Sequence, residues 1–284
     1  MHLSELPEQL IEDAHGVEPL PDSVHRLRTL FAREDWAIGD AIDIVRLDAP
    51  LTARVLQVAN APAFAGRSKI ATLQQAVGRL GARTVLAIAL SAAVRGSLQA
   101  EAPAYGYGPG DLWKRSVASA LAAEALARSV ATVPPDEAFT ASLLQDIGAV
   151  LVSRHLDASL LGLLEMARRQ ALESPLDAER ELLDLDHGEV GRLVAQAWGL
   201  PETLCAAIAH HHDPERAPPE ARDLARLVWA SDRMADAVEA AVQGAPETQE
   251  ATLTSVAERL GLAREQVSEL VERVADQREA LLTA

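Results

Sequence analysis

The sequence has little cysteine, few aromatic residues and almost no lysine. Cys205 is the only cysteine in 284 residues, so no intrachain disulfide can form and no thiolate zinc site can be built. Aromatic residues make up 3% of the chain, whereas alanine, leucine and valine abound, which favours a helical core over a sheet. Lysine occurs only at Lys69 and Lys114, and the net charge is −16. That charge argues against non-specific binding to nucleic acid or to an anionic membrane, because their phosphates would be repelled.

Long hydrophobic runs are also absent. The longest, from Val85 to Val94, is about half of a membrane span. The first eight residues contain neither a basic start nor an apolar stretch, so the sequence predicts no signal peptide. We therefore expect an ordinary globular protein of the cytoplasm, with no membrane partner.

Helical periodicity runs through most of the chain. Apolar residues recur at i, i+4 and i+7 in the segments 51–58 and 73–80. Gly81 follows the second segment, where a helix C-terminal glycine is expected, and Pro50 suits the first turn of the first segment. Alternating strand patterns of useful length are missing. The sequence therefore predicts an all-α fold.

Glycine and proline concentrate between Pro103 and Gly110, which predicts a loop between two helical bundles. We divide the chain into an N-terminal bundle (residues 1–104), a second bundle that carries the candidate ligands (105–245) and a C-terminal helical hairpin (246–284). The loop from Tyr105 to Gly110 is also the candidate hinge between the bundles.

Five later segments matter together: one opens a helix after the glycine-rich loop, and the other four carry histidine or aspartate within helical surroundings. They are Trp113 to Ser116, Gln145-Asp146, Asp186-His187, His210 to His212, and Asp232-Arg233. Separated by helical stretches, these segments could converge on one bundle interior. A mixture of imidazole and carboxylate is the ligand set that borderline and hard divalent metals prefer.

The order of these segments, behind the blocks Asp48 to Asn60 and Ala76 to Gly81, resembles the HDOD family of HD-related output domains in bacterial signalling. The resemblance covers roughly Leu20 to Arg233. It implies an HD-like helical bundle packed on an N-terminal helical bundle. It also implies a regulatory role, since the family has no demonstrated common enzymatic activity.

The resemblance also places the ligands of an active HD phosphohydrolase on this chain. One sequence does not decide which histidine of the run His210-His211-His212 matches the family histidine. The matching positions are Arg115, Gln145, Asp146, His187, His210 or His211, and Asp232.

Two of these matched positions no longer suit a metal. A guanidinium at Arg115 cannot coordinate a cation, and the neutral amide of Gln145 binds metal weakly. We expect Arg115 to pair with Asp146 or Asp232 and to fill the vacated site as an internal ion pair. The sequence therefore predicts no catalytic residue, no metal and no cofactor, and it leaves the seven positions as a candidate degenerate pocket.

The histidines also have structural interpretations. His187 follows Asp186, which can cap a helix, and the run His210 to His212 ends an apolar helix, where it suits the helix dipole. The alternative is a polar pocket that holds a small molecule or a weakly bound ion.

The C-terminal segment 256–267 reads like a helix-turn-helix, preceded by a capping box from Ser255 to Glu258. From residue 246 to 284, four arginines stand against eight acidic residues, a net charge of 4 − 8 = −4. Phosphate contact is therefore unfavourable, although Arg264 and Gln266 would suit it. We expect an accessory hairpin that packs on the domain or on a partner.

The function expected from the sequence is a non-catalytic bacterial signalling module that contacts other signalling proteins. One alternative is a metal-dependent phosphohydrolase or cyclic-nucleotide phosphodiesterase with an altered site. The second alternative is a DNA-associated regulator that uses the C-terminal segment. Neither nucleic acid nor membrane is an expected partner.

Overall fold

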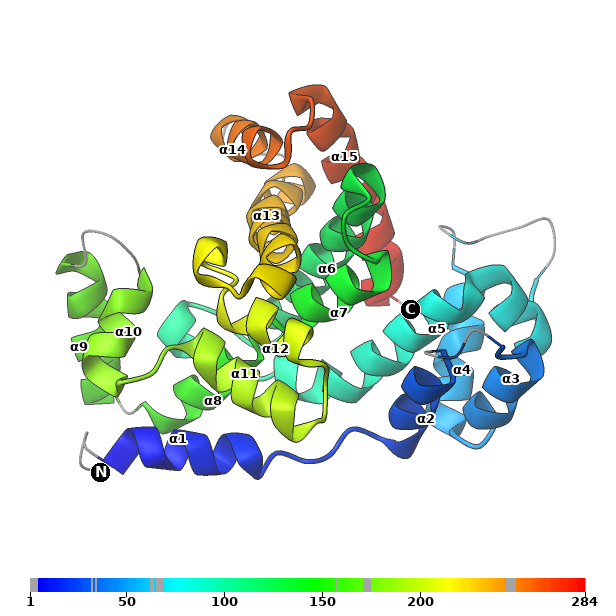
Figure 1. Ribbon diagram of the computed structural model, residues 1–284, viewed down its shortest axis with the longest axis horizontal. Helices are drawn as coiled ribbons and strands as arrows, with labels where there is room; N and C mark the ends of the chain where they lie inside the picture. The colour runs from blue at the N-terminus through cyan, green and yellow to red at the C-terminus, as the bar shows by residue number, and fades with distance from the viewer. Residues whose placement is uncertain are drawn as a thin grey trace.

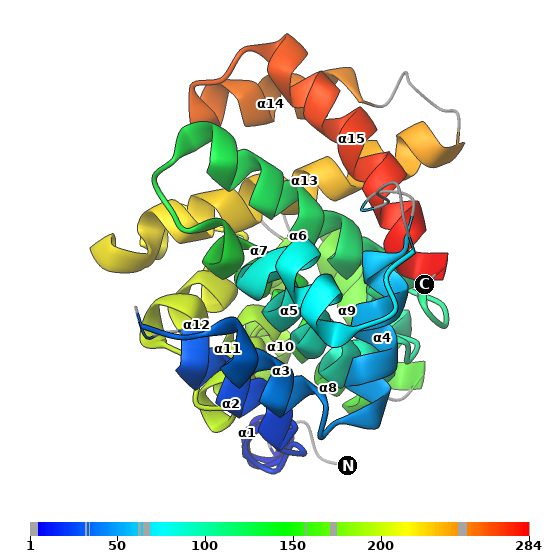
Figure 2. The ribbon, with the colours of Figure 1, turned by 90° about the vertical axis from the view of Figure 1, so that its right-hand side faces the viewer.

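The computed structural model describes residues 5–31, 33, 35–61, 64, 69–156, 158–170, 175–243 and 249–283. Over these ranges it contains fifteen α-helices and no β-strand, and the only extended pairing is an isolated bridge between Ala102 and Tyr107. Figures 1 and 2 show the helices gathered in bundles, with the hairpin at one side. The predicted all-α fold is confirmed.

The N-terminal bundle consists of α2 (Asp22–Phe31), α3 (Ile38–Val45), α4 (Ala49–Ala59) and the start of α5 (Leu73–Leu98). Asp48 caps α4, because its Oδ1 accepts a hydrogen bond of 3.0 Å from the backbone N–H of Leu51. The apolar stripe of α4 is buried against α5. Figure 1 shows this bundle at one end of the molecule.

Helix α5 bends sharply at Gly81 and joins the two bundles. Gly81 has φ of 79° and ψ of 163°, a conformation that is almost exclusive to glycine. The arms Leu73–Ala82 and Thr84–Leu98 meet at 95°. The expected helix end at Gly81 is confirmed, and a second arm begins immediately after it. Among the described residues, no single helix is long and apolar enough to cross a bilayer, and only these two arms together meet those criteria.

The second bundle surrounds the candidate ligands. It contains α6 (Asp111–Val130), α7 (Pro135–Leu144), α8 (Ile147–His155), α11 (His187–Ala197), α12 (Glu202–Ala209) and α13 (Pro219–Gln243). Helix α1 (Leu6–His15) packs on α8 and α11, so the first helix lies against this bundle. Helices α9 (Ala158–Gln170) and α10 (Pro175–Leu183) project from its side (Figure 1). The boundary between residues 104 and 105 stays a prediction.

The C-terminal hairpin is formed by α14 (Glu250–Leu260) and α15 (Arg264–Thr283), joined at Gly261. Helix α14 packs on α13, and α15 packs on both α6 and α13. The expected hairpin is confirmed, but the expected capping box is wrong. Helix α14 begins earlier, at Glu250, so Ser255 lies inside it and donates a hydrogen bond to the carbonyl of Thr252.

Candidate functional site

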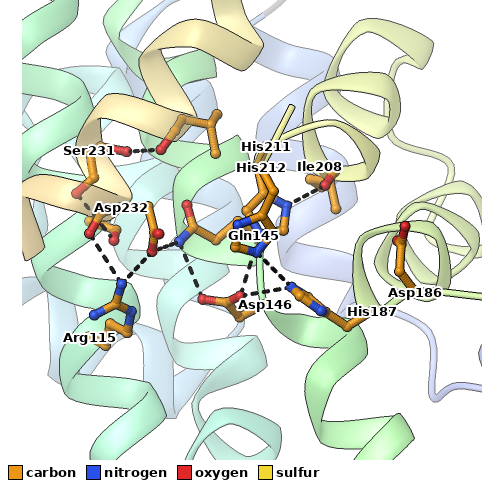
Figure 3. A network of polar contacts seen from close by, with 12 residues as sticks. Arg115, Gln145, Asp146, Asp186, His187, Ile208, His211, His212, Ser231 and Asp232 are labelled. Carbon is orange, nitrogen blue, oxygen red and sulfur yellow. Dashed lines mark hydrogen bonds and ion pairs between the residues drawn. The ribbon is translucent and has the colours of Figure 1, made fainter. Parts of the chain in front are cut away.

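The candidate site lies where α6, α11, α13, the α7–α8 junction and the end of α12 meet (Figure 3). Gln145 and Asp146 occupy the short break between α7 and α8, and both are buried. Asp186 caps α11 by accepting a hydrogen bond of 2.8 Å from the N–H of Glu189. This cap fixes His187 as the first residue of α11, where its side chain is buried.

Arginine, amide and carboxylate groups fill one half of the site. The Arg115 guanidinium lies 2.8 Å from Oδ1 of Asp232, and it also contacts Asp236 one turn further along α13. The Gln145 amide nitrogen donates to the same Asp232 oxygen at 2.6 Å and to Asp146 Oδ2 at 3.3 Å. Of the two partners expected for Arg115, Asp146 and Asp232, the structure shows the ion pair with Asp232.

The charge of Arg115 is secured by these carboxylates. Burial lowers the pKa of the Arg115 guanidinium, but the nearby Asp232 and Asp236 outweigh that effect, so the net pKa is raised. Burial also raises the pKa of the Tyr107 hydroxyl, although the nearby charge of Arg115 partly offsets this effect. The Arg115 guanidinium therefore stays charged and is neutralised by its two aspartate partners.

Histidine side chains fill the other half. Oδ1 of Asp146 lies 3.6 Å from Nε2 of His187 and 3.6 Å from Nε2 of His211. Nε2 of His187 lies 3.1 Å from Nε2 of His212. The four side chains of Asp146, His187, His211 and His212 present one ligand atom each, and these atoms all lie within 4.8 Å of one another. We call this group the histidine cluster.

Three hydrogen bonds orient the cluster from outside. Nδ1 of His211 donates to the carbonyl of Ile208 at 2.7 Å, which leaves the Nε2 lone pair facing the cluster. This buried Nε2 has no hydrogen-bond partner among the described residues. On the other side, one carboxylate oxygen of Glu179 accepts from both the backbone N–H of His187, at 2.8 Å, and its Nδ1, at 2.9 Å. Such outer partners are typical of metal-binding histidines.

The residues of the cluster fit one divalent ion. Four ligands placed about 2.0–2.1 Å from a tetrahedral zinc ion lie roughly 3.3 Å apart, because of the tetrahedral angle. Three of the separations between ligand atoms, of 3.1 Å and twice 3.6 Å, bracket that value. A neutral His211, with its proton on Nδ1, would offer at Nε2 the lone pair that an ion needs. The half that contains Arg115 does not fit a second ion, because a guanidinium offers no lone pair.

Protonation competes with a metal at His187. Burial lowers the pKa of His187, but the adjacent carboxylate of Glu179 outweighs it and raises that pKa to about 9. Burial and neighbouring imidazoles lower the pKa of His212, so His212 is neutral. Burial raises the pKa of Asp146, but His211, His187 and Arg115 together lower it by more. The net pKa is therefore lowered, and the carboxylate is ionised.

The structure brings together most of the positions expected from the sequence. His210 is the exception, since it ends α12 as its C-cap and is not among the four candidate ligands. His212 takes part instead, although the sequence left the choice within this run open. Asp236 and Glu179 belong to the site but were not predicted from the sequence. Asp236 could have been found, because it lies four residues after Asp232 on one helix face.

The predicted hinge loop lies against the site. The ring of Tyr105 meets the His187 ring edge to face, with centroids 5.1 Å apart. Tyr107 pairs with Ala102 in the isolated bridge. A hinge at Tyr105 to Gly110 stays a prediction, and the loop itself forms part of the wall around the polar groups.

Several solved structures share this fold. A protein from Shewanella amazonensis SB2B, whose name provisionally assigns it to the phosphohydrolases, is 24% identical, with 96% of both chains covered and a TM-score of 0.74. An HDOD domain protein of unknown function from Geobacter sulfurreducens is 23% identical, covering 99% of this chain and 98% of its own, with a TM-score of 0.70. At these identities the likeness establishes the fold alone.

A relative by sequence is an uncharacterized protein from Treponema pallidum (strain Nichols), 23% identical over 230 residues. The match covers 79% of this chain but only 43% of that relative. The HDOD domain model matches residues 17–214. Since that match spans most of the sequence, the chain belongs to the HDOD family, a branch of the HD superfamily linked to signalling.

Proposed function

We propose that the protein is a regulatory module that acts through contacts with other signalling proteins and does not hydrolyse phosphate esters. The observation that carries this proposal is the ion pair between Arg115 and Asp232, which fills half of the site. A metal-assisted attack on a phosphate ester commonly uses two ions about 3.5–4 Å apart, which stabilise the attacking and leaving oxygens. Here one of the two positions holds a fixed guanidinium.

The histidine cluster supports the same proposal. Catalytic zinc sites have three protein ligands and leave a fourth position for water or substrate, whereas structural zinc sites have four. Asp146, His187, His211 and His212 supply all four ligands. A tetrahedral ion held by them would have no open position for a nucleophile. When bound, such an ion would chiefly hold α11, α12 and the α7–α8 junction together.

The first test measures hydrolysis and metal content in the same preparation. Protein purified without chelator is analysed for bound zinc, iron, manganese and magnesium, and is assayed with bis(p-nitrophenyl) phosphate. We expect no more than one ion per chain and no turnover. Two ions per chain, or turnover that disappears in an Asp146→Ala variant, would contradict the proposal. The double variant Arg115→His with Gln145→His is the matched comparison, because it restores imidazoles at the altered positions.

A second candidate function is the binding of a single divalent ion as a structural or sensory element. The observation that favours it is the close approach of four ligand atoms, all within 4.8 Å. Zinc titration of chelator-treated protein tests it, with His212→Ala as the variant that removes one ligand. One tight site in the native chain and a weaker one in the variant would support this function.

The DNA-binding alternative has less support. Arg264, one of the two side chains suited to DNA, forms an ion pair of 2.9 Å with Glu250 in the same hairpin. The Gln266 side chain accepts a hydrogen bond from the N–H of Ala263. Both groups are therefore engaged within the hairpin. Duplex binding whose affinity falls steeply with added salt would restore this alternative.

A further inference from the structure

A second cavity lies away from the histidine cluster, at the junction of three parts of the chain. Its volume is about 190 Å³. Its walls come from α4 and α5 on one side, from α6 and α7 on another, and from α15 of the hairpin. None of the residues of the candidate functional site lines it. Figure 2 shows the end of α15 beside α4, in agreement with this shared wall.

The lining of this cavity combines aromatic rings with arginines. Phe64, Trp113 and Phe139 supply three of the few aromatic residues in the chain. Three arginines and one acidic residue supply its charges, which are Arg54, Arg128, Arg273 and Glu124. In a chain of net charge −16, this excess of positive charge runs against the general trend. Arginine planes and aromatic faces together suit a flat ligand that carries an anionic group.

Further positive charge lies beside the cavity. The Arg95 guanidinium lies 5.7 Å from the centroid of the Trp113 ring. Burial lowers the pKa of Arg54, and the charge of Arg95 lowers it as well. A guanidinium can hold a carboxylate through two parallel hydrogen bonds.

The size of the cavity limits the ligand. A cavity of about 150 Å³ accepts benzene. The cavity described here, at about 190 Å³, therefore suits one aromatic ring or a small fused pair with a short substituent. A dinucleotide is too large for it.

We propose that this cavity binds a small aromatic carboxylate, with its ring among the aromatic side chains and its carboxylate at the arginines. The ligand would touch the N-terminal bundle, the second bundle and α15 at once. It would thereby stabilise one arrangement of these three parts. The proposal is independent of what the histidine cluster does, since the two sites share no residue.

The test compares two probes of similar size and shape, one anionic and one neutral. Naphthalene-2-carboxylate and the neutral naphthalene-2-carboxamide are titrated into the full chain by calorimetry. We expect one carboxylate site per chain, with an affinity at least tenfold higher than that of the amide. Equal affinity for the two probes, or no saturable binding of the carboxylate, overturns the proposal.

Two variants locate the site. Arg273 is exposed on α15, so Arg273→Gln preserves the fold, and we expect it to weaken carboxylate binding about tenfold. Arg54→Gln removes a second lining charge and should have a similar effect. The control is Arg46→Gln, which removes an exposed arginine paired with Asp43 outside the cavity. Unchanged affinity in both cavity variants, or an equal loss in the control, also overturns the proposal.

Discussion

The ion pair between Arg115 and Asp232 should contribute measurably to the free energy of unfolding. The two side chains are only 19% and 14% exposed, and their nearest atoms are 2.8 Å apart. Removing one partner of a buried pair costs about 3–5 kcal/mol, because the other charge stays buried without compensation. Asp236, which also contacts Arg115, is 56% exposed and can be hydrated. We therefore expect Arg115→Gln to lower the free energy of unfolding by about 3 kcal/mol, at the lower end of that range.

A double-mutant cycle isolates the pair itself. Arg115→Gln, Asp232→Asn and the double variant are unfolded in urea, and the coupling energy should be about 1–3 kcal/mol, as for residues in one polar network. The matched control is the pair of Arg46 and Asp43, 3.3 Å apart but 61% and 60% exposed, for which we expect about 0.3 kcal/mol. A coupling energy in the first cycle no larger than in the control would refute the view that this ion pair fills the site.

Three further predictions concern the histidine cluster and two glycines. Since the pKa of His187 is raised to about 9, above its ordinary value, its stabilising effect is complete below about pH 6.5 and is lost as the pH rises through about 9. Zinc must displace that proton, so zinc affinity should rise about 100-fold from pH 7 to pH 9 and above. Competition with a chelator measures this affinity, and an affinity that does not change with pH would contradict the role of His187 as a ligand. Gly81→Ala should lower the free energy of unfolding by about 1–3 kcal/mol, because Gly81 has a positive φ. Gly96→Ala, within a regular part of the same helix, should raise it by about 0.5–1 kcal/mol. Equal melting temperatures of the two variants would contradict this prediction. Gly148→Ala should lose at least about 3 kcal/mol in urea unfolding, since its Cβ would lie 2.0 Å from the carbonyl oxygen of His187, and near-native stability would disprove so close an approach of α8 and α11.

Local signals in the sequence were enough to predict the helical elements. Asp48 begins α4 as its cap, Asp186 begins α11, and Gly81 ends the first arm of α5. Each depends on a side chain or a backbone angle within a few residues, which a sequence displays directly.

The histidine cluster depends on geometry that local patterns do not contain. Helix α12 ends at Ala209, and the chain that follows turns His211 and His212 inward while His210 stays at the helix end. Helical spacing cannot predict such a turn, because the three residues lie outside the regular helix. Glu179 reaches His187 from a separate helix, α10, and no spacing rule connects the two.

The contact between Glu179 and His187 gives α9 and α10 a particular position in the molecule. These two helices project from the second bundle, yet a buried carboxylate on α10 holds both the backbone and the ring of His187. Whatever removes the proton from that imidazole changes the bond that fastens α10 to the start of α11. The attachment of the projecting helices therefore depends on the protonation state of His187 in the interior.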